Sequence, residues 1–217
     1  MNKEKIHEII KILRIEYGKY QTPIVTEWAN KRNAFHVLIS CILSLRTKDE
    51  TTRDASTRLF NAADSPYKMI KLNKQEIEKL IYPVGFYRNK AETILNICSD
   101  LIEKYNGQVP DTIDELLKLK GVGRKTANLV VTLGYNKPGI CVDIHVHRIS
   151  NRLGYVNTKN PDKTEFALRE ILPKEYWIEY NDLLVVYGQN VCKPVSPFCS
   201  KCAISDYCDR IGVEKSR

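Results

Sequence analysis

The apolar positions of this 217-residue chain recur mostly every three or four residues, which is the spacing of one face of an α-helix. An alternating apolar and polar pattern, typical of a half-buried strand, never lasts beyond about five residues. The chain is therefore predicted to be all-α. Helices are predicted over residues 2–17, 34–45, 47–62, 73–83, 89–105, 113–118, 124–133, 145–153, 162–172 and 174–191, with a short one opening at Ser65-Pro66.

Three of these helices carry further information about packing or about where a helix begins. Residues 34–45 (AFHVLISCILSL) are apolar on nearly every face, which predicts a helix in the middle of a bundle. Where Thr47 precedes Glu50, a capping box is predicted to start the next helix. The amphipathic segment 2–17 is predicted to turn five residues inward: Ile6, Ile9, Ile10, Leu13 and Ile15.

The most informative stretch is Leu119–Asp143, where Gly121 and Gly123 flank Val122 between two predicted helices. This spacing suits a very tight turn, because glycine adopts positive φ without a steric cost. The segment predicts a helix-hairpin-helix. Its turn amides, and the start of the second helix at Arg124, can receive a phosphate.

Lys125 lies in the first turn of that second helix, where a cation opposes the helix dipole. A lysine that gives up its proton readily is a usable amine nucleophile. The chain rises about 16 Å along the helix and, after a turn at 136–139, returns about 16 Å to Asp143. Singly, Lys125 fits a solvated charge and Asp143 a helix N-cap. Together they indicate an active site.

Two polar loops are candidate ligand contacts. The first (SLRTKD) follows the apolar helix and contains Arg46 and Asp49. The second (GFYRNK, from Gly85) places Phe86 and Tyr87 beside basic residues, a set that can wedge into stacked bases and hold phosphates. Core packing is the alternative for both rings and is favoured for Tyr87.

Composition narrows the class of partner. The chain has 34 Lys and Arg against 26 Asp and Glu, a net charge of +8 and a pI of about 9.0, which favours a polyanion. With 43% hydrophobic residues it can form one large or two small domains. Neither a signal peptide nor an apolar run of membrane-spanning length is visible, so a cytoplasmic protein without a membrane partner is predicted.

The seven cysteines fall into two groups. Three occur singly in apolar segments and are predicted to be buried thiols: Cys41, Cys98 and Cys141. Four cluster near the C-terminus with spacing C-x6-C-x2-C-x5-C: Cys192, Cys199, Cys202 and Cys208. In a cytosolic protein such a cluster indicates metal rather than disulfides. Zinc and a [4Fe–4S] cluster both fit four thiolates, and the presence of a single CxxC pair favours iron–sulfur.

The hairpin LKGVGRKTANLVV, the Asp143 that follows Lys125 by 18 positions, and the cysteine spacing resemble the endonuclease III family. These are helix-hairpin-helix DNA glycosylases with a C-terminal iron–sulfur loop. The resemblance covers residues 20–210. It implies that Lys125 attacks C1′ of a damaged nucleotide, expels the base, forms a Schiff base and cleaves the strand by β-elimination. Asp143 matches the carboxylate that assists nucleophile activation or stabilises the sugar cation.

The resemblance also implies contacts to DNA. Arg46 falls where the family commonly has a glutamine that fills the gap left by a flipped base, and Asp49 matches the Asp of the same motif. Phe86 falls where the family places an apolar wedge, usually leucine. Further DNA contacts are implied at Gly121, Val122, Gly123, Arg124 and His145. The cluster ligands are implied to be Cys192, Cys199, Cys202 and Cys208.

Two α-helical domains are implied, with duplex DNA in a groove between them. A six-helix domain at 26–137 ends in the hairpin, and residues 1–25 plus 138–217 carry the cluster loop at 192–208. The expected protein is a monomer that acts on double-stranded DNA containing a damaged base or an abasic site, in the cytoplasm and associated with the nucleoid.

The sequence departs from the family pattern at two points. The gap-filling loop reads SLRTKD instead of SAQATD, and the wedge is aromatic, so lesion and opposite-base preference stay open. A bifunctional glycosylase/AP lyase for oxidised pyrimidines is the leading prediction. A thymine or uracil mismatch glycosylase of the same fold is the alternative. From another class, a non-catalytic DNA-binding iron–sulfur protein is disfavoured by the pairing of Lys125 with Asp143.

Overall fold

The computed structural model describes residues 5–20 and 33–217. Every regular element in these ranges is helical, which confirms the all-α prediction. None of the described helices is long and apolar enough to cross a membrane. The predicted helix start at Asn2 and the predicted domain boundary at 25/26 lie outside the described residues.

The chain divides into two compact units. Ile24–Lys137 contains the helix-hairpin-helix and is called the hairpin unit below. Met1–Pro23 together with Pro138–Arg217 contains the four clustered cysteines and is called the cysteine unit.

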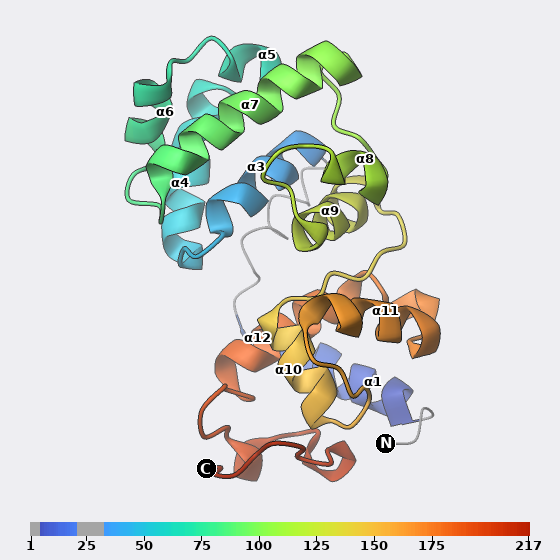
Figure 1. The fold of residues 1–217 in the computed structure, drawn as a ribbon. Helices are drawn as coiled ribbons and strands as arrows, with labels where there is room; N and C mark the ends of the chain where they lie inside the picture. The colour runs from blue at the N-terminus through green and yellow to red at the C-terminus, as the bar shows by residue number, and fades with distance from the viewer. Residues whose placement is uncertain (1–4, 21–32) are drawn as a thin grey trace. The chain divides into compact units, whose positions relative to one another are not determined.

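The hairpin unit is built around a central apolar helix, α3, as predicted. Eight of the eleven residues of α3 are buried, and it packs against α4, α7, α9 and η2 (Figure 1). The α-helices are α3 (Ala34–Ser44), α4 (Asp49–Ala62), α5 (Pro66–Met69), α6 (Lys74–Ile81), α7 (Tyr87–Tyr105), α8 (Ile113–Leu117) and α9 (Arg124–Leu129). The π-helix η2 (Val130–Gly134) continues α9.

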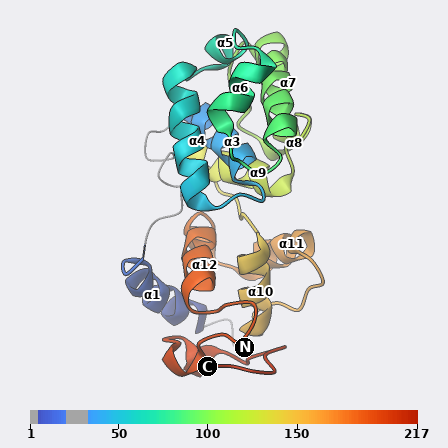
Figure 2. The ribbon, with the colours of Figure 1, turned by 90° about the vertical axis from the view of Figure 1, so that its left-hand side faces the viewer.

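The cysteine unit packs its long helices around a shared core (Figures 1 and 2). α10 and α12 lie side by side, and α1 packs against α12. Its elements are α1 (Ile6–Tyr17), α10 (Ile144–Arg152), α11 (Pro161–Ile171) and α12 (Glu179–Asn190), with the 3-10 turns η3 (Lys174–Tyr176), η4 (Cys199–Lys201) and η5 (Ser205–Tyr207). The core includes Ile6 and Leu13 of α1 with Tyr180 and Tyr187 of α12.

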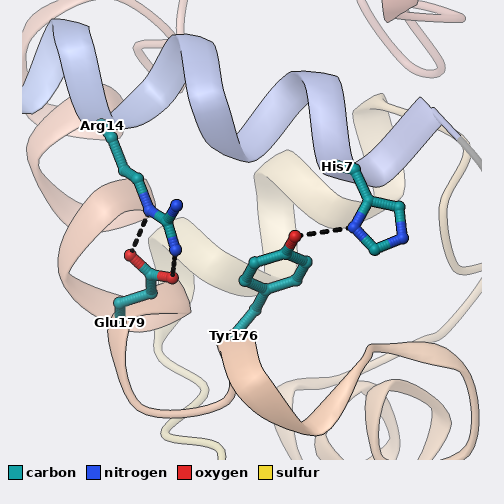
Figure 3. A network of polar contacts seen from close by, with 4 residues as sticks. All are labelled: His7, Arg14, Tyr176 and Glu179. Carbon is teal, nitrogen blue, oxygen red and sulfur yellow. Dashed lines mark hydrogen bonds and ion pairs between the residues drawn. The ribbon is translucent and has the colours of Figure 1, made fainter.

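Polar contacts fix α1 to the rest of the cysteine unit (Figure 3). The Arg14 guanidinium donates two hydrogen bonds to the Glu179 carboxylate, at 2.9 and 2.6 Å, and the Tyr176 hydroxyl lies 2.6 Å from His7 Nδ1. A paired guanidinium–carboxylate contact fixes orientation as well as distance. The N-terminal helix therefore belongs structurally with the C-terminal part of the chain.

Several predicted details of the helices are wrong. Ile15 is 70% exposed because the inward face of α1 ends at Leu13. Thr47 does not cap α4. The N-cap is Lys48, which makes no side-chain capping bond. The Thr47 hydroxyl accepts hydrogen bonds from the Gly85 amide and the Lys90 amine instead. The predicted helix over 124–133 changes to π geometry after its first six residues, and the one over 174–191 is divided into η3 and α12.

Candidate DNA-binding and catalytic site

The predicted turn of the helix-hairpin-helix is present between α8 and α9. Val122 donates its amide to the Leu119 carbonyl at 3.0 Å and closes the turn. Gly121 has a φ of +91°, and a Cβ at this position would lie 2.7 Å from Thr93 Cγ2 of α7, so glycine is required. Gly123 has an ordinary negative φ of −95°. Positive φ is therefore needed at one of the two glycines only.

Lys125 is an exposed residue in the first turn of α9. The first hydrogen bond of this helix joins Ala127 N to Gly123 O at 2.9 Å, so Lys125 lies at the end where helix amides face outward. α9 packs against α3, where burial raises the pKa of the Cys41 thiol to about 12 and the charge of Lys125 acts in the opposite direction. The amine is thus accessible from outside and lies within electrostatic reach of the buried α3.

Asp143 is the N-cap of α10, as predicted. Its Oδ1 accepts hydrogen bonds from the amides of His145 at 2.8 Å and Val146 at 3.0 Å, and the residue is 9% exposed. Lys125 belongs to the hairpin unit and Asp143 to the cysteine unit. Their meeting at one active site therefore stays a prediction.

The structure brings Arg46 and Phe86 together at the surface of the hairpin unit. The Arg46 guanidinium carbon lies 5.6 Å from the centre of the Phe86 ring, within the range of a cation–π contact. Phe86 is 60% exposed, so the core-packing alternative is wrong for this ring. Tyr87 is half-buried and meets Tyr82 edge to face at 5.5 Å. Asp49, the first residue of α4, is half-buried next to this loop.

Lys90 of α7 belongs to the same region. The sequence placed it among the basic residues of the second loop that could hold phosphates, but the structure buries it. It is 7% exposed, and burial lowers the pKa of its amine to about 8. The signal was present in the spacing, because Lys90 shares one helical face with the buried Ile94, Ile97 and Leu101. A lysine on an apolar helix face indicates a buried amine with specific acceptors.

The four clustered cysteines are all half-buried in the cysteine unit and follow α12. Burial raises the pKa of the Cys202 and Cys208 thiols, and the neighbouring thiols raise both further. The four sulfur atoms thus lie within electrostatic reach of one another. Among the described residues, no group of three or more His, Cys, Asp or Glu side chains is arranged to hold a metal ion. The predicted ligand set therefore stays a prediction.

Two arginines of α10, not singled out from the sequence, hold the start of the cysteine loop. Arg152 is 9% exposed and donates to the carbonyls of Lys193 and Pro194, each at 2.7 Å, and to Cys192 Sγ at 3.4 Å. Arg148 donates to the Cys192 carbonyl at 2.8 Å and lies 3.1 Å from His145 Nδ1. The sequence indicated only that the two arginines, four residues apart, lie on the same face of a helix.

Three comparisons place these features among known proteins. Residues 39–174 match the HhH-GPD superfamily base excision DNA repair protein model. Endonuclease III of Thermotoga maritima is 49% identical over 81% of this chain and 82% of its own length. Endonuclease III homolog 2, chloroplastic, of Arabidopsis thaliana is 43% identical over 82% of this chain, which spans about half, 48%, of that longer relative.

The chain belongs to the HhH-GPD superfamily of base excision DNA repair proteins. Its fold is similar to the structure of a trapped endonuclease III–DNA covalent intermediate, with a TM-score of 0.86, 36% sequence identity and 97% of both chains covered. The resemblance noted in the sequence is thereby confirmed, and so is the helix-hairpin-helix fold.

Proposed function

We propose that this chain is a bifunctional DNA N-glycosylase/AP lyase that removes oxidised pyrimidines from duplex DNA in base excision repair. The observation that carries the proposal is the exposed Lys125 at the first turn after the hairpin. It occurs in a chain that is similar, over 97% of its length, to an endonuclease III trapped covalently on DNA. The substrate would be double-stranded DNA, met by the protein in the cytoplasm and at the nucleoid.

In the proposed reaction, the damaged nucleotide is first flipped out of the duplex. The neutral Lys125 Nζ attacks C1′, the bond from C1′ to the base breaks, and the base leaves with the electron pair and is protonated. The amine loses a proton and the sugar ring opens, which gives a Schiff base between Nζ and C1′. Loss of a C2′ proton then expels the 3′ phosphate, and water releases the lysine. Asp143 would accept a proton or stabilise the sugar cation.

The remaining predicted residues would hold the DNA. Among the hairpin residues, Gly121 to Arg124, the Val122 amide closes the turn, and the amides of Gly123 and Arg124 lie at the start of α9, where a phosphate can bind. Arg46 would occupy the gap left by the flipped base, and Phe86 would press against the orphaned partner. Asp49 and His145 would contact the DNA from the ends of α4 and α10.

Borohydride trapping on abasic-site DNA tests the lyase step. The wild type should form a covalent adduct, and Lys125→Ala should form none. Lys118→Ala is the matched control, because Lys118 is an exposed lysine beside the same hairpin. Its ion pair with Glu115 lies at the surface. A wild type that traps no DNA would refute the proposed activity.

A panel of lesion duplexes tests substrate choice. Thymine glycol and dihydrouracil should be excised, and uracil and G·T mismatches should be left intact. The reverse pattern would support the alternative, a thymine or uracil mismatch glycosylase of the same fold. Binding without excision or trapping on any duplex would support the non-catalytic iron–sulfur alternative.

A [4Fe–4S] cluster held by Cys192, Cys199, Cys202 and Cys208 is also part of the proposal. The donor set fits: four neighbouring thiols that would bind as thiolates, with Arg152 donating to the Cys192 sulfur at 3.4 Å and Tyr187 to the Cys202 sulfur at 3.2 Å. Hydrogen bonds and positive charge near sulfur offset the charge of thiolates. When bound, such a cluster supplies a redox-capable structural centre.

Iron analysis and visible absorbance test the cysteine site. The purified protein should contain iron and absorb broadly in the violet, and Cys202→Ser should lose both. Cys98→Ser is the matched control, because Cys98 is a buried thiol of α7 in the hairpin unit. A colourless protein that contains zinc would overturn the iron–sulfur assignment.

A further inference from the structure

The two candidate DNA-probing residues share an unusual backbone conformation. Arg46 has a φ of 53° and Phe86 a φ of 58°, both in the left-handed region that side chains with a Cβ rarely adopt. Each lies in a short loop that precedes a helix, Arg46 before α4 and Phe86 before α7. Conformations of this kind persist only where the surrounding contacts hold them.

The two loops hold each other at close range. Gly85 donates its amide to the Thr47 hydroxyl at 3.1 Å. A Cβ on Gly85 would lie 2.6 Å from the Arg46 carbonyl oxygen, so only glycine allows this approach. Thr47 in turn donates to the Leu45 carbonyl at 3.2 Å. The hydroxyl of Thr47 is therefore the junction between the loop that carries Arg46 and the loop that carries Phe86.

The buried amine of Lys90 ends at this junction. Its Nζ donates to the Leu43 carbonyl at 2.8 Å, the Leu45 carbonyl at 2.5 Å and the Thr47 hydroxyl at 3.2 Å. An ammonium has three donors, and these three acceptors all lie on the segment that leads into and out of Arg46. The Lys90 backbone amide also donates to the Phe86 carbonyl at 3.0 Å. One residue of α7 thus contacts both loops.

We propose that Lys90 is a positioning residue. It holds the two loops in one arrangement, so that Arg46 and Phe86 together enter the space that a flipped-out nucleotide leaves in the duplex. This inference rests on the proposed function, because it assigns Lys90 to the step that opens the duplex and not to the chemistry at Lys125. Burying a lysine amine among neutral acceptors costs more free energy than burying an apolar side chain at the same position. An apolar residue would fill it without ordering the carbonyls on either side of Arg46.

Lys90→Met tests the proposal, because methionine keeps the unbranched apolar stem of the side chain and removes the Nζ donors. Single-turnover excision of a lesion from duplex DNA should slow roughly tenfold to 100-fold, the effect expected when positioning groups shift by about 1 Å. Borohydride trapping on a single-stranded abasic-site oligonucleotide should stay at the wild-type rate, because no base has to be displaced there.

Lys104→Met is the matched control on the same helix, since Lys104 is exposed and pairs only with Asp100 at the surface among its described contacts. It should leave both reactions unchanged. If Lys90→Met slows duplex excision and single-stranded trapping equally, Lys90 is merely structural and the proposal is overturned. Unchanged duplex excision would overturn it as well. A wild type that traps nothing would instead refute the proposed function.

Thr47 supplies a second variant in case Lys90→Met folds poorly. Thr47→Val removes the junction hydroxyl at constant shape and should reproduce the selective loss of excision on duplex DNA. Thr47→Ser keeps the hydroxyl and should excise at the wild-type rate. Because both residues act through one junction, the double variant Lys90→Met/Thr47→Val should lose little more than Lys90→Met alone. Additive losses, or a Thr47→Val variant with normal excision, would contradict the shared role.

Discussion

The two units hold their candidate functional groups in opposite ways. In the hairpin unit, Lys125, Arg46 and Phe86 are exposed, and the buried Lys90 supports the loops that carry Arg46 and Phe86. In the cysteine unit, the thiols are half-buried and the start of their loop is held by the buried Arg152. An exposed side chain can be substituted without loss of packing, whereas a buried one cannot. Substitutions should therefore affect mainly activity in the hairpin unit and mainly stability in the cysteine unit.

Asp143 is the expected exception in the cysteine unit, because it is proposed to act in the chemistry and its substitution should affect mainly activity. Asp143→Asn keeps an N-cap that can accept the same two amide bonds but removes the negative charge. We expect single-turnover excision to fall by roughly 10²- to 10⁴-fold, with unfolding nearly unchanged.

The control for that experiment is Asp143→Ala. It removes cap and charge together, so it should show the same loss of rate and an additional loss of about 1 kcal/mol in unfolding free energy. If Asp143→Asn excises bases at the wild-type rate, the carboxylate serves only as a helix cap.

Arg152, at the other end of α10, should show the behaviour of an enclosed group. Arg152→Met leaves the Lys193 and Pro194 carbonyls without their donor, and the expected loss of unfolding free energy is about 2–4 kcal/mol. Urea denaturation measures it, with Arg210→Met as the control because Arg210 is exposed. A loss no larger than that of the control would show that the loop does not depend on α10.

The buried amine of Lys90 predicts a pH dependence of stability. Burial lowers its pKa to about 8 from the ordinary 10.5, so between these values the unfolded chain binds more proton than the folded one. Stability contributed at this position therefore rises with pH. The unfolding free energy of the wild type relative to Lys90→Met should increase by about 1–2 kcal/mol from about pH 7.5 to 9.5. A constant difference in paired denaturation curves would show that the folded amine keeps its ordinary pKa, and a falling one that its pKa is raised.

Local patterns predicted the helices and the turn well, because their causes lie within a few residues. The apolar faces of α3, the cap at Asp143 and the turn glycine at Gly121 all follow from spacing and residue type. Ile15 failed because periodicity does not show where an inward face ends.

Contacts between distant segments could not be predicted in this way. Thr47 has the spacing of a capping residue, but its hydroxyl is used by Gly85 and Lys90, about forty positions away in sequence. Arg152 likewise meets carbonyls about forty positions further along the chain. Side chains that support a site from another element leave only a weak signal, a charged residue on an otherwise apolar helix face.

Mapping the trapped adduct shows which amine of the protein is the nucleophile, which we propose to be Lys125. Wild-type protein is reduced with borohydride on abasic-site DNA, digested, and its modified peptide sequenced by mass spectrometry. The sugar remnant should be attached to Lys125 Nζ. Attachment to another amine, such as Lys90 or the N-terminus, would show that Lys125 is not the nucleophile.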